Sequence, residues 1–465
     1  MKWLMVLALF ARTMPETLEK IFRQQDWKTD PNKASERAGY YRGLLARQNL
    51  TPSIEVRARM DLAENLVVAG DFEAAVREIE TLQKTTRERG IVLNAAFTKR
   101  LHETLGIAYL RLGEQRNCVS NHNAQSCVYP LRQGGLHQDQ RGANGAVREY
   151  TALLEQDSQN LAARWLLHLA HMQLGTAAPP RWRIRENLLP DEFDIGRFAD
   201  VAHEAGVSVA THAGGSIAED FDGDGLFDLI VSSSGPQDPL RYFHNKGDGT
   251  FEDWTASAGL TGITGGLNVI HADFNNDGRP DVLVLRGGWW GKHGKYPPSL
   301  LRNVDGKRFE DVTEKAGLLS FHPTQTAAWG DYDNDGWDLF IGHESSREES
   351  HASQLFHNNH DGTFTDVAAA AGLANLGYVK GAAWGDFNND GRIDLYVSRK
   401  GEPNKLFQNE GGGRFTDVTA KAGVAEPIHS FATWWFDYDN DGWLSEVVSQ
   451  QSRRDVSRCD QGRGA

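Results

Sequence analysis

The sequence predicts a two-domain protein in which an N-terminal domain of paired helices precedes an all-β domain of repeated four-stranded sheets. Three observations indicate this fold class. Apolar residues recur at three- and four-residue steps between about residues 38 and 176, as they do in amphipathic helices. Beyond residue 193 a phenylalanine-led box occurs five times, and an acidic, glycine-containing loop follows each copy at a constant distance. A chain of 465 residues also exceeds the roughly 100 to 200 residues of one ordinary domain.

Charge and hydropathy argue against two classes of protein. The 63 acidic and 49 basic residues give a net charge of −14, which repels polyanions, so nucleic acid is not an expected partner. No run approaches the about 20 apolar residues that span a bilayer, so no transmembrane segment is expected. Lys2 precedes an apolar run over residues 3–11, but Arg12 follows without a clear cleavage site. Residues 1–15 are therefore either a short export signal of a secreted or periplasmic protein, or the first turn of a buried helix.

Residues 16–176 are predicted to form a helical domain. Two segments, LGIAYLRLGE and GAVREYTALLEQDSQNLAARWLLHLAHMQLG, resemble tetratricopeptide repeats, in which a glycine closes the first helix and an aromatic-alanine pattern packs the second. Gly113 and Gly175 hold corresponding places but lie 62 residues apart. Because the tetratricopeptide period is about 34 residues, an insert is predicted at residues 114–143. The proline-containing residues 177–192 are predicted to be a linker.

The insert contains four candidate metal ligands, namely Cys118, His122, Cys127 and His137. Their spacing differs from the paired C-x₂₋₄-C and H-x₃₋₅-H pattern of structural zinc sites. Three interpretations stay open: a disulfide between Cys118 and Cys127 in an exported protein, a second metal or redox site that uses a transition metal, and unpaired side chains. The third cysteine, Cys459, is interpreted as incidental.

The five boxes belong to a repeat that is predicted to form the all-β domain at residues 193–444. Within each copy, the phenylalanine of the box and the first aspartate of the loop are 22 residues apart, as from Phe198 to Asp220. The distance from that aspartate to the next box varies between 29 and 36 residues, so insertions are confined to one connection. The boxes begin at Phe198, Phe251, Phe309, Phe364 and Phe415.

Each repeat contains four short segments with strand character. In the fourth copy they read AAWGD before the acidic loop, DLYVS after it, then NKLFQN and RFTDVT. Glycine-containing turns such as HDGT and EGGG separate the last two segments, as in tight hairpins. Four-stranded units of about 50 residues are typical of β-propeller blades, which close in a circle and so bury the edges of their sheets. The acidic loops and the hairpins are expected on one face of the propeller.

The acidic loops indicate a chemistry. Loops such as DFNNDGRPD place carboxylates or amides at positions 1, 3 and 5, a glycine at position 6 that permits a sharp turn, and a carboxylate at position 9. Together with the carbonyl of position 7, these oxygens can surround one ion. Ca²⁺ takes about six to eight oxygen ligands, whereas Mg²⁺ demands a tighter octahedron and softer metals prefer nitrogen or sulfur. The repetition therefore predicts Ca²⁺ sites, although one such loop alone could be an acidic turn without an ion.

Through these loops and the F-x-D-V-T-x-x-A-G-L box, the sequence resembles FG-GAP or VCBS repeat proteins, whose members include the propeller of integrin α subunits, and it is similar to the cartilage-acidic-protein family. The resemblance implies Ca²⁺-stabilised blades, an extracytoplasmic location and a role in adhesion or binding, and it implies no catalytic residues. Carried over position by position, it implies as metal ligands Asp220, Asp222, Asp224, Asp228, Asp273, Asn275, Asp277, Asp281, Asp331, Asp333, Asp335, Asp386, Asn388, Asp390, Asp394, Asp437, Asp439 and Asp441.

The third and fifth loops depart from this pattern. The third is one residue short, which leaves Leu339 at position 9 and Asp338 at position 8, and the fifth has Ser445 in place of the last carboxylate. Residues 445–465 are predicted to form an anomalous tail without a further strand, hairpin or box. Five repeats are also fewer than the roughly seven blades that the integrin resemblance suggests, so the propeller is expected to be incomplete at the C-terminus, as in a truncated or frame-shifted product, and a ring of four or five blades is the alternative.

The longest variable loop of the repeats, RGGWWGKHGKYPPS, is rich in aromatic side chains. Exposed rings of this kind can stack on a sugar or a peptide, and the alternative is aromatic packing between neighbouring blades. The side chains concerned are Trp289, Trp290, His293 and Tyr296.

Two hypotheses for the function follow. The first is a secreted or periplasmic protein in which Ca²⁺ stabilises the blades while the helices and variable loops bind a protein or carbohydrate partner. The second is a redox or transition-metal enzyme that uses the insert with Cys118, His122, Cys127 and His137, with the propeller as its scaffold. No nucleophile triad, phosphate-binding loop or pair of catalytic acids stands out in the sequence, which favours the first hypothesis.

Overall fold

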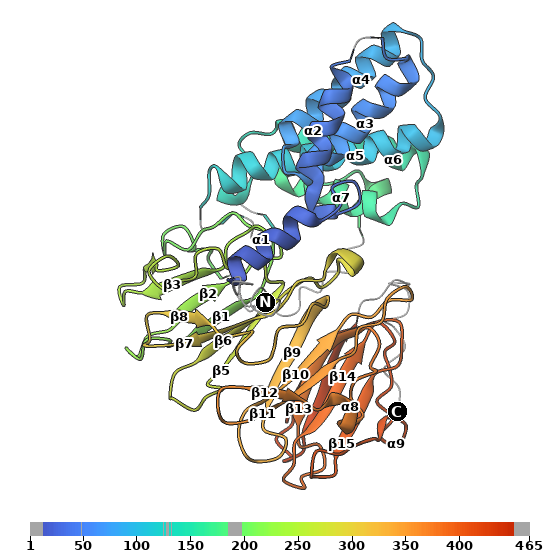
Figure 1. Cartoon of the computed structure of the whole chain (residues 1–465). Coiled ribbons are helices and arrows are strands. Elements are labelled where there is room, and N and C mark those ends of the chain that lie inside the picture. The colour runs from blue at the N-terminus through green and yellow to red at the C-terminus, as the bar shows by residue number, and fades with distance from the viewer. Residues whose placement is uncertain are drawn as a thin grey trace, which may run out of the picture. The chain divides into compact units, whose positions relative to one another are not determined.

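The computed structural model describes residues 13–47, 49–123, 125–126, 130–131, 133–184 and 198–450. The chain forms two compact units, one at residues 26–208 and one that combines residues up to 25 with those from 209 onward. In Figure 1 the first unit is helical and runs from blue to green, and the second holds the strands, coloured green to red. No helix among the described residues combines the length and the apolar character needed to cross a bilayer.

In the helical unit, each α-helix packs against the next one along the chain. Polar residues begin four of these helices: the side chains of Thr51, Asp71, Asn94 and Asn160 each accept a hydrogen bond from the backbone N–H three residues later. The described helices are α2 (Ala34–Leu45), α3 (Pro52–Val68), α4 (Phe72–Glu88), α5 (Ala95–Glu114), α6 (Arg141–Gln156) and α7 (Leu161–Gln173). Short helical segments lie at η1 (Pro31–Lys33), η2 (Gln115–Val119), η3 (Gln133–Gly135) and η4 (Pro180–Trp182).

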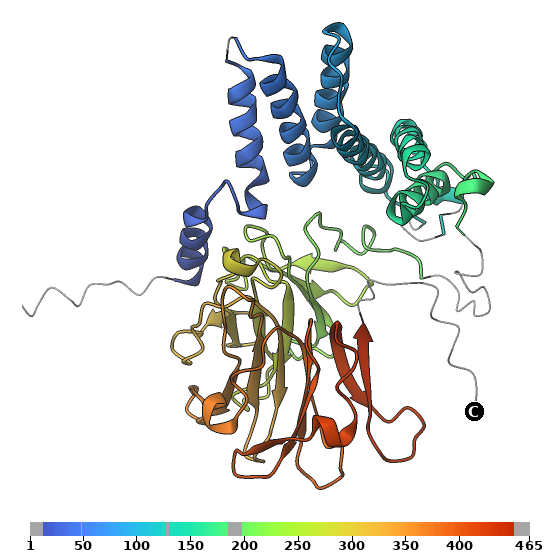
Figure 2. The ribbon, with the colours of Figure 1, turned by 90° about the vertical axis from the view of Figure 1, so that its right-hand side faces the viewer.

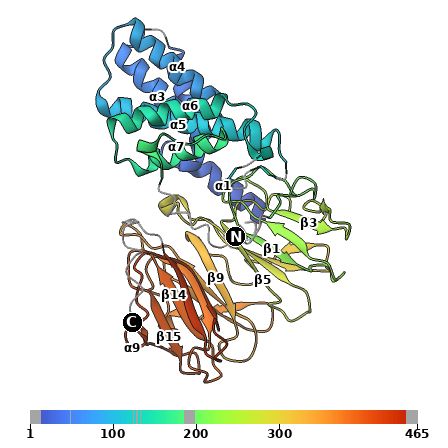
Figure 3. The same ribbon diagram turned by 180° about the vertical axis from the view of Figure 1, so that it is seen from behind.

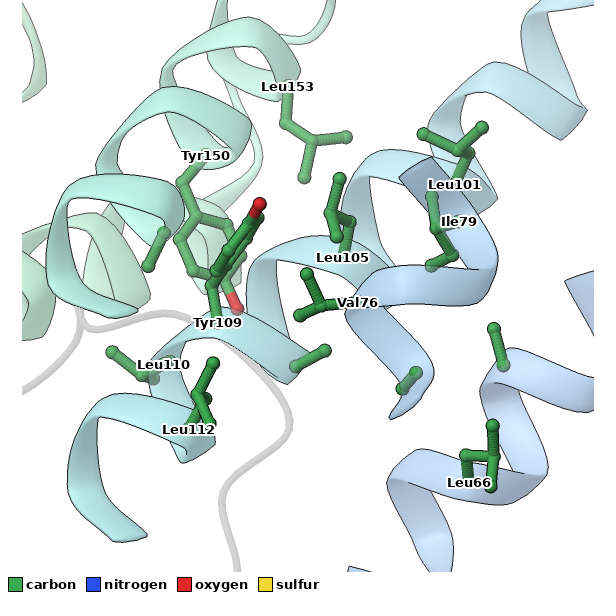
Figure 4. Close-up of a cluster of buried hydrophobic side chains, with 14 of the residues drawn as sticks. Leu66, Val76, Ile79, Leu101, Leu105, Tyr109, Leu110, Leu112, Tyr150 and Leu153 are labelled. Atoms are coloured by element: carbon green, nitrogen blue, oxygen red, sulfur yellow. The ribbon is translucent and has the colours of Figure 1, made fainter. Parts of the chain in front are cut away.

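Two tyrosines fill the interface between α5 and α6 (Figure 4). Tyr109 of α5 and Tyr150 of α6 are both buried. A Cβ added to Gly145 of α6 would lie 2.4 Å from Cγ of Tyr109, and a Cβ added to Gly106 of α5 would lie 2.9 Å from Cζ of Tyr150. Each ring therefore occupies the space over a glycine of the other helix. The two helices are neighbours although residues 115–140, which belong to the insert predicted at residues 114–143, separate them along the chain.

The β unit consists of four-stranded antiparallel sheets followed by a two-stranded one. Within each four-stranded sheet every strand pairs with its neighbour in the chain, as predicted from the four strand segments of a repeat. The first two sheets contain β1 (Ser216–Glu219), β2 (Asp228–Val231), β3 (Arg241–Asn245), β4 (Phe251–Asp253), β5 (Asn268–Ala272), β6 (Asp281–Leu285), β7 (Ser299–Asn303) and β8 (Phe309–Asp311).

The third and fourth sheets repeat this order, and short helices follow their last strands. They contain β9 (Thr324–Gly330), β10 (Asp338–His343), β11 (Gln354–Asn358), β12 (Phe364–Asp366), β13 (Val379–Gly385), β14 (Asp394–Arg399), β15 (Lys405–Asn409) and β16 (Phe415–Asp417). The two-stranded sheet contains β17 (Ser430–Phe436) and β18 (Ser445–Gln450). The short helices of the unit are η6 (Gly291–His293), α8 (Ala368–Ala371) and α9 (Thr419–Ala422).

Consecutive sheets pack through their first strands. The strands β1, β5, β9, β13 and β17 are neighbours in this order, and Figures 2 and 3 show the sheets in succession from green to red. Between sheets, the phenylalanine of a box packs on the aromatic residue at position 2 of the acidic loop of the preceding sheet. The ring centroids are 5.8 Å apart for Phe221 and Phe309, 5.7 Å for Phe274 and Phe364, and 5.8 Å for Tyr332 and Phe415.

Helix α1 (Met14–Gln24) is grouped with the sheets and not with the other helices. Met14 and Leu18 are 8% and 1% exposed, and they share a hydrophobic core with side chains of the first two sheets. Residues 16–24, which the sequence placed in the helical domain, therefore belong to the β unit. The reason is the apolar stripe of α1, which is buried on the sheets.

The tail predicted at residues 445–465 begins with a strand, which corrects the prediction that no strand follows the fifth loop. Residues 445–450 form β18, which pairs with β17. Val447 and Val448 favour this conformation because β-branched side chains pack well on a pleated surface. Residues 451–465, with Cys459, lie outside the described residues, as do residues 1–12 of the predicted export signal.

The first box differs from the other four. No strand forms within residues 198–208, and Phe198 is 86% exposed. In the other repeats the box strand pairs with the strand just before it, as β4 pairs with β3. The residues at that place before Phe198, 185–197, lie outside the described residues. The prediction that each box forms a strand is therefore confirmed for the second to fifth boxes, each of which follows a described strand.

Candidate metal centres

Each acidic loop connects the first strand of a sheet to the second. Positions 4 and 6 have positive φ, as at Asn276 (54°) and Gly278 (84°) in the second loop, and glycine and asparagine tolerate this conformation best. The carboxylate of position 1 holds the turn, because Asp273 accepts hydrogen bonds from the N–H of Asp277 at 3.0 Å and of Gly278 at 2.7 Å. The same two bonds recur in the first, fourth and fifth loops. The sequence of the loop thus closes it around its own first aspartate.

The carboxylate of position 9 is buried where three strands meet. Asp281 is the first residue of β6 and is 1% exposed. It accepts hydrogen bonds from the N–H of Asn303 at 2.7 Å and of Phe274 at 3.3 Å. Burial raises the pKa of Asp281 to about 7, with a smaller contribution from neighbouring aspartates, and burial raises the pKa of Asp394 in the fourth loop to about 6. In both loops the backbone hydrogen bonds to the carboxylate offset only part of the cost of burying its negative charge.

Asp338 takes the position-9 role in the third loop, which corrects the prediction that Leu339 stands there. Asp338 is the first residue of β10, is fully buried and pairs with Gly330, as Asp281 pairs with Ala272. Its carboxylate accepts the N–H of Asn358 at 2.9 Å, and burial raises its pKa to about 7. The missing residue is absorbed at Gly336, whose φ is 152° where the other position-6 glycines have 84–87°. The pairing of Asp338 with Gly330 therefore assigns Asp338 to position 9, and the sequence alone does not show this pairing.

The structure brings some of the predicted ligands together and leaves others apart. In the part of the chain that the structure describes, three or more histidine, cysteine or acidic side chains have ligand atoms within 4.8 Å of one another only in the first, third and fifth acidic loops. These groups are Asp220, Asp222 and Asp224; Asp222, Asp228 and His244; Asp333, Asp335, Asp338 and His357; and Asp437, Asp439 and Asp441. Asp331, at position 1 of the third loop, is outside its group.

The second and fourth loops have an asparagine at position 3 and so one carboxylate fewer, and in both an arginine at position 7 contacts the ligand at position 5. Arg279 Nη2 lies 2.5 Å from Asp277 Oδ2, and Asn275 Nδ2 donates to the same oxygen at 3.1 Å. The fourth loop repeats both contacts around Asp390 with its own arginine and asparagine. An ion in either loop has to compete with this guanidinium for the carboxylate.

The donors of the first loop fit a hard cation. Asp220, Asp222 and Asp224 offer carboxylate oxygens only, which Ca²⁺ prefers, at a spacing that the flexible coordination of Ca²⁺ accommodates. Burial raises the pKa of Asp222, and the nearby carboxylates of Asp228 and Asp224 raise it further. A bound divalent cation would relieve this repulsion. The fifth loop gathers the same three oxygen donors at positions 1, 3 and 5.

An asparagine that the sequence reasoning missed links each of the first three acidic loops to the next sheet. At the end of the third strand of a sheet, the side-chain Nδ2 donates to the position-2 carbonyl of the preceding loop. The distances are 2.8 Å from Asn303 to Phe221, 2.8 Å from Asn358 to Phe274 and 2.7 Å from Asn409 to Tyr332. The signal was present in the sequence, because an asparagine ends the segments RYFHN, SLLRN, QLFHN and KLFQN.

Two histidines beside the acidic loops were also missed. His244 and His357 stand immediately before the asparagines of the first and third sheets. His244 Nδ1 lies 3.1 Å from Asp228 Oδ1, and its ring stacks on Trp254 at 3.8 Å. His357 Nδ1 lies 3.2 Å from Asp333 Oδ2 and 3.4 Å from Asp338 Oδ1. In the second and fourth sheets the same place holds an arginine and a glutamine.

The Cys/His insert of the helical unit is only partly described. Cys118 Sγ lies 3.6 Å from His137 Nε2, and burial lowers the pKa of His137. His122 Nδ1 lies 3.0 Å from the carbonyl of Cys118, and its Nε2 lies 3.4 Å from an oxygen of Asp200. Cys127 lies outside the described residues, so the disulfide and metal interpretations both stay predictions.

The aromatic loop is largely engaged within the β unit. Trp289 stacks on Phe431 of the fifth sheet at 5.3 Å, and Lys380 Nζ lies 3.2 Å from the centre of its ring. Tyr296 is 2% exposed, and its ring meets that of Trp290 edge to face. His293 Nδ1 lies 3.0 Å from Oε1 of Gln25. These contacts are packing within the β unit but not between neighbouring sheets, and Trp289 keeps 40% of its surface exposed.

The loop geometry agrees with comparisons to known proteins. The model of the FG-GAP-like repeat family matches residues 220–284, 337–397 and 386–448. Each of these segments starts within an acidic loop. Cartilage acidic protein 1 of Homo sapiens is 30% identical over 266 residues, which cover 54% of this chain and 38% of that protein. This chain therefore contains FG-GAP-like repeats and is similar to cartilage acidic protein 1 over about half of its length.

Two further relatives are similar to this chain to a comparable degree. Cartilage acidic protein 1 of Mus musculus is 29% identical over 265 residues, which cover 54% of this chain and 39% of the mouse protein. The Xenopus tropicalis protein of that name is 33% identical over 185 residues, which cover 37% of this chain and 27% of the frog protein. The chain thus matches about two fifths or less of the length of these FG-GAP relatives.

Proposed function

We propose that this chain is a calcium-stabilised β-propeller protein that acts outside the cytoplasm and binds a protein or carbohydrate partner. Similarity to FG-GAP repeats and to cartilage acidic protein 1 supports an extracellular, integrin-like adhesion role. The order in which successive sheets adjoin through their first strands supports assembly as propeller blades. Of the predicted export segment at residues 1–15, Met14 and Pro15 belong to α1, so the residues before Thr13 would supply the export signal. The helical unit, with tetratricopeptide-like hairpins, would offer a further surface to a partner.

The observation that supports the calcium proposal is the cluster of carboxylates in the acidic loop, next to the buried first residue of the second strand. In the first loop three carboxylates lie within 4.8 Å of one another, and Asp222 also lies next to the fully buried Asp228. Like charges at this separation repel one another, and burial adds to the cost of ionising them. A Ca²⁺ ion that binds only the folded state removes this cost and stabilises the fold by about 2.7 kcal/mol at a free concentration 100 times its Kd.

Thermal melting of the full chain tests this proposal. We expect Ca²⁺ to raise the Tm of the β unit relative to EGTA, Mg²⁺ to have a smaller effect, and mass spectrometry of the metals to find bound calcium. Asp222→Asn should reduce the Ca²⁺-induced shift, and it suits the loop fold because asparagine stands at this position in the second and fourth loops. Asp248→Asn, in an exposed hairpin, is the control with the same change of charge. A Tm that is indifferent to both EGTA and Ca²⁺ would overturn the proposal.

Partner binding needs its own test. The intact chain can be immobilised and probed with a glycan array and with extracellular matrix proteins, each in Ca²⁺ and in EGTA. We expect binding that is lost in EGTA, because ion loss would loosen the loops that hold the sheets together. Calcium binding without any binding of glycans or matrix proteins would contradict the adhesion part of the proposal and leave the calcium part intact.

A further inference from the structure

We propose that a hollow along the first strands of the first three sheets is a binding site for a neutral sugar ring. The inference deepens the proposed function, since it rests on a carbohydrate partner and names the place and the chemistry of its recognition. The hollow measures about 540 Å³, and three successive residues from each of β1, β5 and β9 line it together with Trp337. These strands are neighbours in this order and can be followed in Figure 1. The volume falls within the about 300–1,000 Å³ that is usual for ligand pockets.

Trp337 supplies an exposed aromatic surface at this hollow. It is 40% exposed and stands at position 7 of the third acidic loop, a position that offers its backbone carbonyl to an ion and not its side chain. The same position holds Leu226, Arg279 and Arg392 in three other loops, so the loop conformation does not require a ring there. The indole of Trp337 can therefore receive the C–H face of a sugar, which packs on the electron-rich face of an aromatic ring.

A second tryptophan shows that the boundary between the second and third sheets lacks a bond that the later boundaries have. Trp384 and Trp435, at the corresponding place in the fourth and fifth sheets, donate their indole N–H to carbonyls of the preceding sheet, at 3.1 Å to Ala328 and 3.4 Å to Ala383. Nε1 of Trp329 in the third sheet makes no hydrogen bond with a described residue. The hollow lies at this boundary, because Trp329 and residues of β5 line it.

Polar groups border the hollow beside the two indole rings. His271 lines it, and its Nε2 lies 3.1 Å from Oε2 of Glu219, with 38% and 31% of the two side chains exposed. Each of the three first strands pairs with a single strand of its sheet, so its other edge presents backbone N–H and C=O groups. The hydroxyls of a sugar both donate and accept hydrogen bonds, so one ring can satisfy such groups while its C–H face covers an indole.

The composition of the hollow favours a neutral sugar over an anionic sugar or a peptide. Among the described residues that line it, none is a lysine or an arginine, and Glu219 adds a negative charge at its border. A sialylated or sulfated sugar would therefore be repelled. An extended peptide that adds to a sheet edge follows one strand, whereas this hollow takes only three residues from each of three strands. A compact ring can contact all three strands at once.

A glycan array with neutral, sialylated and sulfated members, probed with the full chain in millimolar Ca²⁺, tests the inference. We expect binding to neutral glycans, and the one bound most strongly is then titrated against the chain while tryptophan fluorescence is followed. Trp337→Leu should weaken this binding at least about tenfold, because it removes the ring but keeps a residue that the first loop has at this position. His271→Ala should weaken it as well, which keeps the test valid if one variant folds poorly. Trp443→Leu is the matched control, because Trp443 holds the same position in the fifth loop, is 52% exposed and does not line the hollow.

The outcomes separate this inference from the proposed function. If neutral glycans bind but Trp337→Leu and His271→Ala bind them as the unchanged chain does, the hollow is not the sugar site and the carbohydrate partner stands. If only anionic glycans or only matrix proteins bind, the inference is overturned and the adhesion part of the proposed function stands. If neutral glycans bind through Trp337 while EGTA and Ca²⁺ leave the Tm unchanged, the inference holds and the calcium proposal fails.

Discussion

Replacing Asn303 by alanine tests whether asparagine side chains hold consecutive sheets together. Asn303 is fully buried, and its Nδ2 donates to the carbonyls of Phe221 at 2.8 Å and Pro280 at 3.3 Å, while its Oδ1 accepts the N–H of Gly306 at 2.8 Å. Alanine leaves these three backbone groups without that partner. Each buried polar group left unsatisfied costs about 1–3 kcal/mol, and since the hairpin around Gly306 can admit water, we expect a total of about 3 kcal/mol.

The assay is thermal unfolding of the full chain, followed by a signal of the β unit such as tryptophan fluorescence. For a unit of this size, about 1 kcal/mol corresponds to a shift of about 2–4 °C, so the Tm should fall by about 6–12 °C. Asn245→Ala is the matched control, because Asn245 Nδ2 reaches only the carbonyl of Phe227 in its own sheet, at 2.9 Å. We expect that variant to lose about 1 kcal/mol. If Asn303→Ala melted at the same temperature as Asn245→Ala, the bond between sheets would contribute nothing and the reasoning would be refuted.

Three further predictions address pH, the helical unit and the first helix. The pKa of Asp281 is raised to about 7 from an ordinary value near 3.8, so between these values the folded protein binds more protons than the unfolded one. In EGTA, therefore, the Tm should fall as pH rises from about 4 to about 7, and Asp281→Asn should flatten this slope. Gly145→Ala should destabilise the helical unit by about 1–3 kcal/mol in a circular dichroism melt, because the added Cβ would lie 2.4 Å from the Tyr109 ring. Changing an exposed glycine to alanine should not lower the stability of this unit. Leu18→Ala should cost the β unit about 2–5 kcal/mol in denaturant titrations, and equal midpoints for this variant and Glu19→Ala would show that α1 does not pack there.

The sequence was informative where local geometry dictates the structure. A constant 22-residue spacing left no room for insertions between a box and the next loop, so the place of the loop between two strands could be predicted. The loop itself closes through contacts between residues at most five apart, such as those of Asp273 with Asp277 and Gly278. Such turns are encoded by a few glycines, asparagines and aspartates.

The sequence was uninformative where partners lie far apart in the chain. Asn358 reaches Phe274 across 84 residues, and no local pattern indicates that contact. The correct place of Asp338 depends on the pairing of β9 with β10, because the shortened loop could have lost its residue on either side of Gly336. The packing of α1 on the sheets depends likewise on surfaces that only the folded β unit forms.

In the second and third loops, a single residue at position 2 connects the candidate ion site to the next sheet. In the second loop, the N–H of Phe274 donates to the carboxylate of Asp281 at 3.3 Å, and its carbonyl accepts the side chain of Asn358 at 2.8 Å. Its ring packs on Phe364 of the following sheet, with centroids 5.7 Å apart. A change in the charge of the position-9 carboxylate therefore acts on a residue that also forms the boundary between sheets. Because Tyr332 makes the same three kinds of contact one sheet later, with Asp338, Asn409 and Phe415, the stability of these two sheet boundaries should depend on the ionic state of the loop before each of them.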